Sequence, residues 1–248
     1  MHLMSLERLW GKAMRLALMQ PYFFPYIGYF SIVKQVDRYI VLDTVQYIEH
    51  GWMNRNRILK PDGGWQYIRV PIKKHSSTAL IPEVLIDNSQ KWEQKLCNQL
   101  QHYKKAPYYE QTMQVVQNIL EKKHDAICDL NVTILKEICR YLQIDTQINL
   151  LSESGLEYEQ PKDSDEWGLN ICRAVQGVTE YWNAPGGKDF FDLSKYQRYG
   201  ISVKFQKMIL DEYPQKGNAF EPGLSILDVM MFNSPDQITN MMNRYELV

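Results

Sequence analysis

Three short apolar segments of this chain each end abruptly at a polar residue, and this pattern is the strongest constraint on its fold. The segments are RLALM before Gln20, RYIVL before Asp43 and TEYW before Asn183. A short apolar run bounded in this way is typical of a buried strand that emerges at the edge of a sheet. Because ligands of open α/β sheets bind at the carboxyl ends of parallel strands, the three ends predict a site.

The rest of the chain alternates helical and strand patterns. We expect helices over 28–35, 166–176, 188–198, 222–232 and 235–243, and three more over 89–142 that begin near Ser89, Pro107 and Asp125. Strands are expected over 15–19, 38–42, 65–72, 81–86, 147–151, 180–183 and, last, 201–206, with a PDGG turn at 61–64. This order predicts an α/β fold: a mainly parallel, Rossmann-like sheet flanked by helices, with a small antiparallel excursion and a helical insertion.

Length and composition set the class of protein. The 248 residues fit a single domain over 14–248 with a helical subregion at about 89–142, and we expect residues 1–13 to be an extension outside the fold. A net charge of −1 argues against a nucleic-acid or membrane surface, and no apolar run approaches a membrane span. Four cysteines without a CxxC pair predict free thiols and a cytoplasmic protein, and no histidine spacing predicts a metal.

The loop QPYFFPYIGYF places aromatic rings at a helix entrance. A helix N-terminus favours phosphate or carboxylate, and Gly28 would let a ligand approach the backbone, so Gln20, Tyr22, Tyr26 and Gly28 are candidate binding residues. The alternative is a rigid aromatic corner. The chain contains neither a GxGxxG fingerprint nor a GxxxxGK[ST] loop.

The stretch VQYIEHGWMNRNR combines amides, aromatic rings and arginines. Arg55 and Arg57 would point the same way on an extended strand and could clamp a diphosphate. Candidate partners for the same ligand are Gln46, Tyr47, Trp52, Asn54 and Asn56, with His50 as a candidate base. The alternative is a solvated basic edge strand.

Two further segments supply candidates. In NAPGGKDFF, Gly186 and Gly187 could form an anion-binding nest, with Lys188 adding charge at the helix start, and Asn183 is a further binding candidate; the alternative is a simple turn with a solvated lysine. In PGLSILDVMMFN, Asp228 lies in an apolar helix one turn after Ser225. A buried carboxylate needs a partner such as an arginine, or it faces a site, so Asp228 is a candidate catalytic residue or a structural one.

Taken together, QPYFFPYIGYF, the stretch from Asp43 to GWMNRNRI, NAPGGK, FEPGLSILDVMMFNS and the terminal YELV resemble the WbqC-like protein family over nearly the whole chain. The resemblance implies an association with bacterial surface-polysaccharide (O-antigen) gene clusters. The family motif falls on Gln20, Pro21, Tyr22, Tyr26, Gly28, Asp43, Gln46, Tyr47, Gly51, Trp52, Asn54, Arg55, Asn56, Gly186, Gly187, Lys188, Ser225 and Asp228. His50 stands where the resemblance implies a basic residue, often arginine, which argues against a base role.

The leading hypothesis is a transferase that moves an acyl or aminoacyl group onto a nucleotide-linked amino sugar. The arginines and Gly-Gly-Lys would hold the diphosphate, and Asp43 or His50 would accept the amine proton. The donor would be a coenzyme A or carrier-protein thioester, with the basic stretch Lys73–His75 docking an acidic carrier. The alternatives are an ATP-dependent ligase or nucleotidyltransferase, and a sugar-nucleotide-binding module without catalysis.

Overall fold

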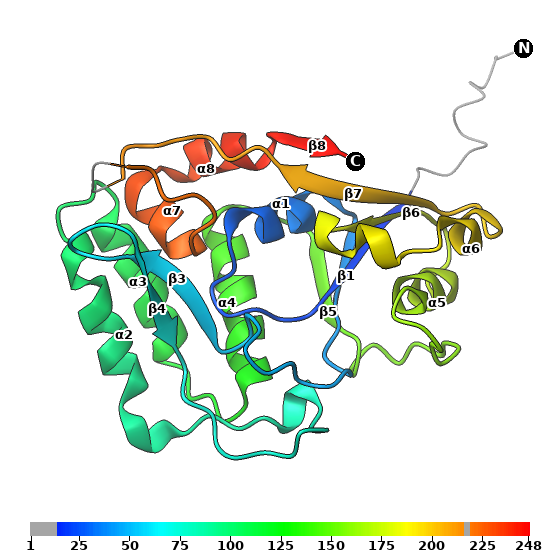
Figure 1. The fold of residues 1–248 in the computed structure, drawn as a ribbon, viewed down its shortest axis with the longest axis horizontal. Helices are drawn as coiled ribbons and strands as arrows, with labels where there is room; N and C mark the ends of the chain where they lie inside the picture. Colours follow the sequence, from blue (N-terminus) through cyan, green and yellow to red (C-terminus); the bar gives the residue numbers. More distant parts are fainter. Residues whose placement is uncertain (1–13, 216–218) are drawn as a thin grey trace, which may run out of the picture.

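The computed structural model describes residues 14–215 and 219–248, so the expected extension over 1–13 lies outside the described residues. In these residues six strands form one sheet in the order β5-β2-β1-β6-β7-β8 (Figure 1). Their bounds are β1 Met14–Met19, β2 Arg38–Val41, β5 Gln147–Leu150, β6 Val178–Asn183, β7 Ser202–Met208 and β8 Tyr245–Leu247. All neighbours are parallel except β7 and β8, which confirms the predicted α/β fold.

The order of the strands reverses between β1 and β6. From β1 the chain builds β2 and β5 on one side, and it then returns to add β6 and β7 on the other side. The carboxyl ends of β1 and β6 therefore flank a topological switch point, where the connections leave in opposite directions. In open α/β sheets this crevice is the usual place for a ligand.

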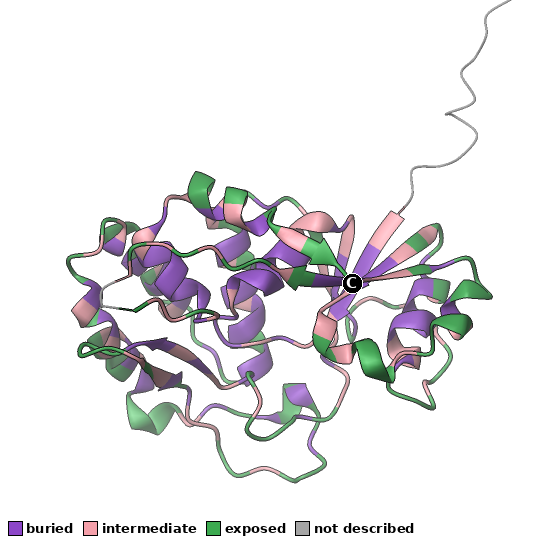
Figure 2. Cartoon of the chain, turned by 45° about the horizontal axis from the view of Figure 1, so that its top comes forward, coloured by how far each residue is buried: buried purple, intermediate pink, exposed green. Residues whose placement is uncertain are grey.

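Both faces of the sheet are buried, which explains why its strands are apolar without strict alternation. Leu16 and Leu18 of β1 pack with one cluster, while Ala17 between them packs into the other. Figure 1 shows α5 and α6 on one side of the sheet and the other helices on the opposite side, with α2 farther out beside the β3–β4 hairpin. In Figure 2, buried residues gather on the strands and the inner sides of the helices.

The helices form in segments of the sequence with a helical pattern of apolar residues. Their bounds are α1 Ile27–Gln35, α2 Trp92–Leu100, α3 Tyr109–Leu120, α4 Ile127–Tyr141, α5 Glu166–Ala174, α6 Leu193–Gln197, α7 Ile226–Phe232 and α8 Pro235–Met242. The predicted antiparallel excursion is confirmed as the hairpin of β3 (Arg55–Leu59) and β4 (Trp65–Arg69). Its turn contains Gly63 and Gly64, both with positive φ, a conformation that glycine adopts without a steric cost.

Three local predictions around the helical region are wrong. The segment 81–86 forms a 3₁₀ helix over Ile81–Glu83 instead of a strand, because Pro82 lacks an N–H and Glu83 caps the N–H of Leu80. Ser89 is not a helix cap, since it lies in a second 3₁₀ helix over Asn88–Gln90 that Asp87 caps. Asp125 does not cap α4, because an isolated bridge from Leu85 to Ala126 holds this stretch extended.

Three other boundaries differ near the carboxyl half. The predicted helix over 188–198 divides into a 3₁₀ helix, Pro185–Phe190, and α6, which Asp192 caps. Helix α7 begins at Ile226 instead of Pro222, because Gly223 has a φ of +66° and Ser225 is the cap. The last strand is β8, an edge strand that pairs antiparallel to β7, where no strand is expected from the sequence.

The four cysteines are unpaired. Cys128, Cys139 and Cys172 are buried and Cys97 is half-buried. Burial raises the pKa of the Cys128 and Cys139 thiols to about 12, which keeps them protonated and unreactive. In the part of the chain that the structure describes, no helix is long and apolar enough to cross a membrane.

Candidate functional site

Two adjoining cavities lie at the switch point. The first has a volume of about 630 Å³ and the second about 790 Å³, and their linings share Leu18, Gln20, Leu42, Asn183 and Gly187. Gln20 follows β1 and Asn183 ends β6, so the structure brings these two strand-end residues together as the sequence predicts. Asp43, which follows β2, lines neither cavity.

Many of the residues predicted from the sequence line this cleft. They are Gln20, Tyr22, Tyr26, Gln46, Tyr47, Trp52, Asn56, Arg57, Asn183, Gly186 and Gly187. The cavity linings do not include Gly28, Asp43, His50, Asn54, Arg55, Lys188, Ser225 or Asp228. The three candidate catalytic residues are thus all outside the linings.

Two buried asparagines hold the walls of the first cavity together. The Asn131 side-chain amide donates to the carbonyl oxygens of Pro21 (3.0 Å) and Met53 (2.8 Å). The Asn56 amide donates to the carbonyl oxygens of Phe23 (3.0 Å) and Phe24 (2.9 Å). Loop 20–26 and the segment 52–56 are therefore fixed to each other, which preorganises the cavity.

The turn at Phe24 is strained. Its φ is +40°, in the left-handed region that bulky residues rarely adopt. The Phe24 carbonyl oxygen accepts hydrogen bonds from Asn56 and from the Ser225 hydroxyl (2.8 Å), and its ring is fully buried. Strained backbone held by surrounding groups is common at ligand-binding sites.

Arg57 brings a positive charge to the first cavity. Its guanidinium carbon lies 5.6 Å from the centre of the Trp52 ring and 5.2 Å from that of Trp65. Nη2 donates to the carbonyl oxygen of Gly223 (3.3 Å), while the buried Nε has no partner. No carboxylate among the described residues pairs with Arg57, so its remaining N–H groups are available to an anion.

Neutral phenols line the same cavity. Burial raises the pKa of Tyr22, and burial followed by the neighbouring Tyr22 raises the pKa of Tyr26. Burial also raises the pKa of Tyr29, whose hydroxyl donates to the Gln20 carbonyl oxygen (2.9 Å). These side chains can donate hydrogen bonds and stack on rings, but they are poor bases at neutral pH.

Asp43 and His50 occupy positions that do not suit the predicted base. Asp43 is 1% exposed, and its two oxygens accept hydrogen bonds from the backbone N–H (3.1 Å) and the hydroxyl of Ser152. It therefore joins the ends of β2 and β5. His50 is exposed in a turn with a φ of +62°, where its carbonyl oxygen accepts from Arg55.

Asp228 lies on α7, and its side chain is buried in the core. Its carboxylate accepts hydrogen bonds from the hydroxyls of Tyr103 and Tyr213, both at 2.6 Å, and from Gln215 Nε2 at 2.8 Å. Burial raises the pKa of Asp228, although these hydrogen bonds oppose the shift. The arginine suggested as a partner is thus replaced by two tyrosines and a glutamine.

The glycine predictions need correction. Gly28 does not admit a ligand, because the Tyr26 ring lies against it, 2.4 Å from the position of an added Cβ. Gly186 and Gly187 line the first cavity, but they lie in a right-handed 3₁₀ helix and neither has positive φ. Lys188 is exposed and outside both linings.

The second cavity contains residues that the sequence analysis does not identify. Glu49 brings a carboxylate to it, and Trp167, Tyr181 and Phe191 bring aromatic rings. Trp167 lies in the first turn of α5, directly after a polar loop, and an aromatic side chain in that position is a signal that the sequence offers. Glu49 carries no local signal, because a lone acidic residue in a loop is usually solvated.

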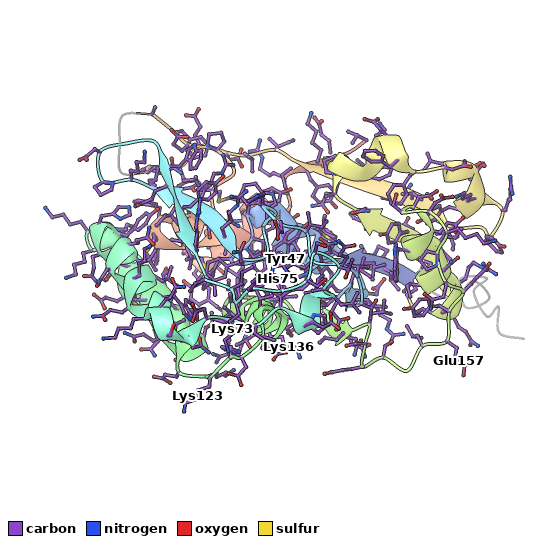
Figure 3. The ribbon with its side chains drawn as sticks, turned by 60° about the horizontal axis from the view of Figure 1, so that its bottom comes forward. Tyr47, Lys73, His75, Lys123, Lys136 and Glu157 are labelled. Carbon is purple, nitrogen blue, oxygen red and sulfur yellow. The ribbon has the colours of Figure 1, made fainter. Side chains whose placement is uncertain are left out.

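A basic segment borders the second cavity. The His75 ring packs on the Tyr47 ring with 5.2 Å between centres, and Figure 3 shows the two side chains next to each other. Ser77 lines the cavity, and Lys73 and Lys74 are exposed. In residues 14–215 and 219–248, no three His, Cys, Asp or Glu side chains are grouped as metal ligands.

The fold and the cleft define a doubly wound α/β protein with two cavities at its switch point. The chain belongs to the WbqC-like protein family, whose profile matches residues 20–240. It is similar to "Uncharacterized protein Rv1507c" of Mycobacterium tuberculosis (strain ATCC 25618 / H37Rv), with 32% identity over 223 residues, which is 88% of this chain and 93% of that protein. No solved structure matches the chain.

Proposed function

We propose that this protein is a transferase that acylates or aminoacylates a nucleotide-linked amino sugar in the synthesis of a bacterial surface polysaccharide. The observation that carries the proposal is Arg57, a guanidinium without a carboxylate partner among the described residues, set between two indole rings at the switch point. A phosphate of the nucleotide would bind its free N–H edge. Tyr22 and Trp52 would contact the base or the sugar.

Glu49 is the group that we assign to proton transfer. It is the acidic side chain in the lining of the second cavity, whereas Asp43 would first have to release Ser152. The amine nitrogen of the sugar attacks the thioester carbonyl carbon, a C–N bond forms and the C–S bond breaks. Glu49 accepts the proton lost by the amine, and the thiolate leaves and is protonated.

The donor would reach the cleft from the side of the second cavity. The aromatic rings of Trp167 and Phe191 offer apolar surface for an acyl group. A carrier protein with an acidic helix would dock against exposed Lys73 and Lys74, next to this cavity. A coenzyme A thioester would need no such docking.

The test is a transfer assay followed by mass spectrometry. Purified protein is incubated with amino-sugar nucleotides in combination with coenzyme A and carrier-bound thioesters, and the proposal predicts a mass shift of the sugar nucleotide. Glu49→Gln should lower the turnover rate by about 10²–10⁴-fold, the range of general base catalysis. Glu153→Gln, on an exposed carboxylate outside both linings, is the control and should keep wild-type turnover.

A second function, a sugar-nucleotide-binding module without catalysis, is favoured by one specific observation. The three residues chosen as catalytic from the sequence all lie outside the cavity linings. This alternative predicts saturable binding of the sugar nucleotide with no mass shift for any donor. Glu49→Gln would then alter affinity alone.

A further inference from the structure

The hairpin of β3 and β4 carries arginines that alternate with aromatic side chains. The register pairs Arg55 with Arg69 and Arg57 with Tyr67, and residues two apart on a strand share a face. We call Arg55, Arg57, Trp65, Tyr67 and Arg69 the hairpin ladder. On the opposite face of the hairpin, Asn56, Ile58 and Ile68 are buried and Gln66 is half-buried.

The outer part of the hairpin ladder concentrates positive charge. The guanidinium carbons of Arg55 and Arg69 lie 4.8 Å and 4.9 Å from the centre of the Tyr67 ring. Like charges directly opposite each other on two strands destabilise a sheet. No carboxylate among the described residues forms an ion pair with either arginine, so within residues 14–215 and 219–248 no ion pair neutralises this charge.

Stacking leaves the hydrogen-bonding edge of each guanidinium available. A guanidinium that stacks on a ring uses its flat face, which keeps the N–H donors in its plane free for other partners. Arg55 gives two of these donors to the carbonyl oxygens of His50 and Gly51. Arg69 is exposed, and its guanidinium makes the ring contact with Tyr67 without a hydrogen bond to another described residue.

We propose that Arg55 and Arg69 form a second anion site, beside the cavity that contains Arg57. The Cα atoms of residues two apart on a strand are separated by roughly 7 Å, and the Arg57 guanidinium contacts other rings than those of Arg55 and Arg69, so we expect the ligand to carry two separate anionic groups. The two phosphates of a single diphosphate share a bridging oxygen and are too close to fill both sites. This inference rests on the proposed function in one respect, namely that Arg57 binds the first anion.

A ligand of this kind is a nucleotide with an additional anionic group. The second group is either a phosphate on the ribose or a carboxylate on the attached sugar. Both have the planar or tetrahedral oxygens that a guanidinium fork binds in pairs. The hairpin ladder thus selects a nucleotide with the additional anionic group over its counterpart without that group.

Titration calorimetry on the purified full chain at constant low salt tests this selection. Adenosine 3′,5′-bisphosphate is compared with adenosine 5′-monophosphate, and uridine diphosphate glucuronic acid with uridine diphosphate glucose. In one of these pairs, the ligand with the additional anion should bind about tenfold more tightly to the wild type, the effect of a charge-assisted contact. Arg69→Gln should remove this advantage and leave the affinity of the other ligand within about twofold.

The controls separate a specific site from general charge. Arg173→Gln removes another ring-stacked arginine, 4.3 Å from the Tyr199 ring, and should keep the advantage. Arg69→Lys keeps the positive charge but not the planar guanidinium, so it should keep part of the affinity advantage of the ligand with the additional anion.

Three results would overturn the inference: no advantage or no binding in both pairs, an equal loss for both ligands of a pair in Arg69→Gln, or Arg69-dependent binding of a single-stranded oligonucleotide with similar affinity. A failed transfer assay would leave these binding ratios unchanged.

Discussion

At the scale of single residues, Asp228 is a fully buried carboxyl in the core. Its pKa is raised above the ordinary value of 3.8 by burial, even though Tyr103, Tyr213 and Gln215 donate hydrogen bonds to it. Gln215 also exchanges two hydrogen bonds with the backbone of Glu221. Asp228 therefore holds the segment before α7, which reaches Gly223 in the first cavity.

Because the pKa of Asp228 is raised in the folded protein, we expect the stability of the protein to depend on pH. Between pH 3.8 and the higher pKa of the folded state, the folded protein binds more protons at Asp228 than the unfolded chain does. The stability contributed by this group is therefore complete below pH 3.8 and is lost as the pH rises through the folded pKa. Urea unfolding from pH 4 to 7 should show the wild type losing stability relative to Asp228→Asn as the pH increases.

The control for this prediction is Asp236→Asn, which removes an exposed carboxylate from the first turn of α8. The difference between wild type and this variant should not reproduce the same decline. The prediction is contradicted if the free energy of unfolding of the wild type, relative to that of Asp228→Asn, stays constant or rises with pH. Such a result would show that Asp228 is ionised without cost in the folded protein.

At the scale of elements, the start of α7 joins the helix to the site. Ser225 Oγ accepts from the N–H of Leu227 (3.3 Å) and donates to the Phe24 carbonyl oxygen (2.8 Å), and the Ser225 N–H donates to the Arg57 carbonyl oxygen (2.8 Å). A helix cap, a strained turn and the backbone of Arg57 thus meet at one serine. Ser234 caps α8 in a capping box with Gln237, away from the cleft.

The two serines form a matched pair for mutation. Ser225→Ala and Ser234→Ala should each lower the free energy of unfolding by about 0.5–2 kcal/mol through loss of a cap. Only Ser225→Ala should also weaken binding of a sugar nucleotide, because it removes one of the two side-chain hydrogen bonds that hold the Phe24 carbonyl oxygen in the turn beside Arg57. Denaturant unfolding measures the stability and calorimetry measures the affinity for the sugar nucleotide. Equal affinities of the two variants would show that the start of α7 does not support the binding site.

The elements also show what a sequence can and cannot predict. The strands before Gln20, Asp43 and Asn183 follow from local apolar runs, and the structure contains all three. The direction of a polar side chain depends on partners distant in sequence, so Asp43 turns to Ser152 and away from the cleft. Likewise, the contact of Gly28 with the Tyr26 ring depends on how a side chain folds back over the helix.

The hairpin is an intermediate case. The sequence predicts that Arg55 and Arg57 share one face of a strand. The segment WQYIR has the same alternation, which places Trp65, Tyr67 and Arg69 on one face, but these three residues are not among the predicted site residues. Pairing of the two strands was needed to place all five side chains on one surface. The register of two paired strands depends on the turn between them and on how their faces pack, so it is not read from either strand alone.

At the scale of the whole molecule, the reversal of strand order places the cleft. Loops from β1, β2 and β6 and the hairpin meet over the switch point, and the two cavities share their central residues there. The buried amides of Asn56 and Asn131 keep these walls in position. Arg57 contributes charge on one side and Glu49 on the other, which suits a ligand with a phosphate and an amine.

The measurement that tests the central claim most directly is calorimetric titration of a nucleotide-linked amino sugar into the wild type, Arg57→Gln and Arg173→Gln. If Arg57 holds the phosphate, Arg57→Gln should weaken binding by about 1.5–3 kcal/mol, roughly 10- to 150-fold, because a charge-assisted hydrogen bond is lost. Arg173→Gln, on the other side of the sheet, should bind like the wild type. Equal affinities for wild type and Arg57→Gln would contradict the account.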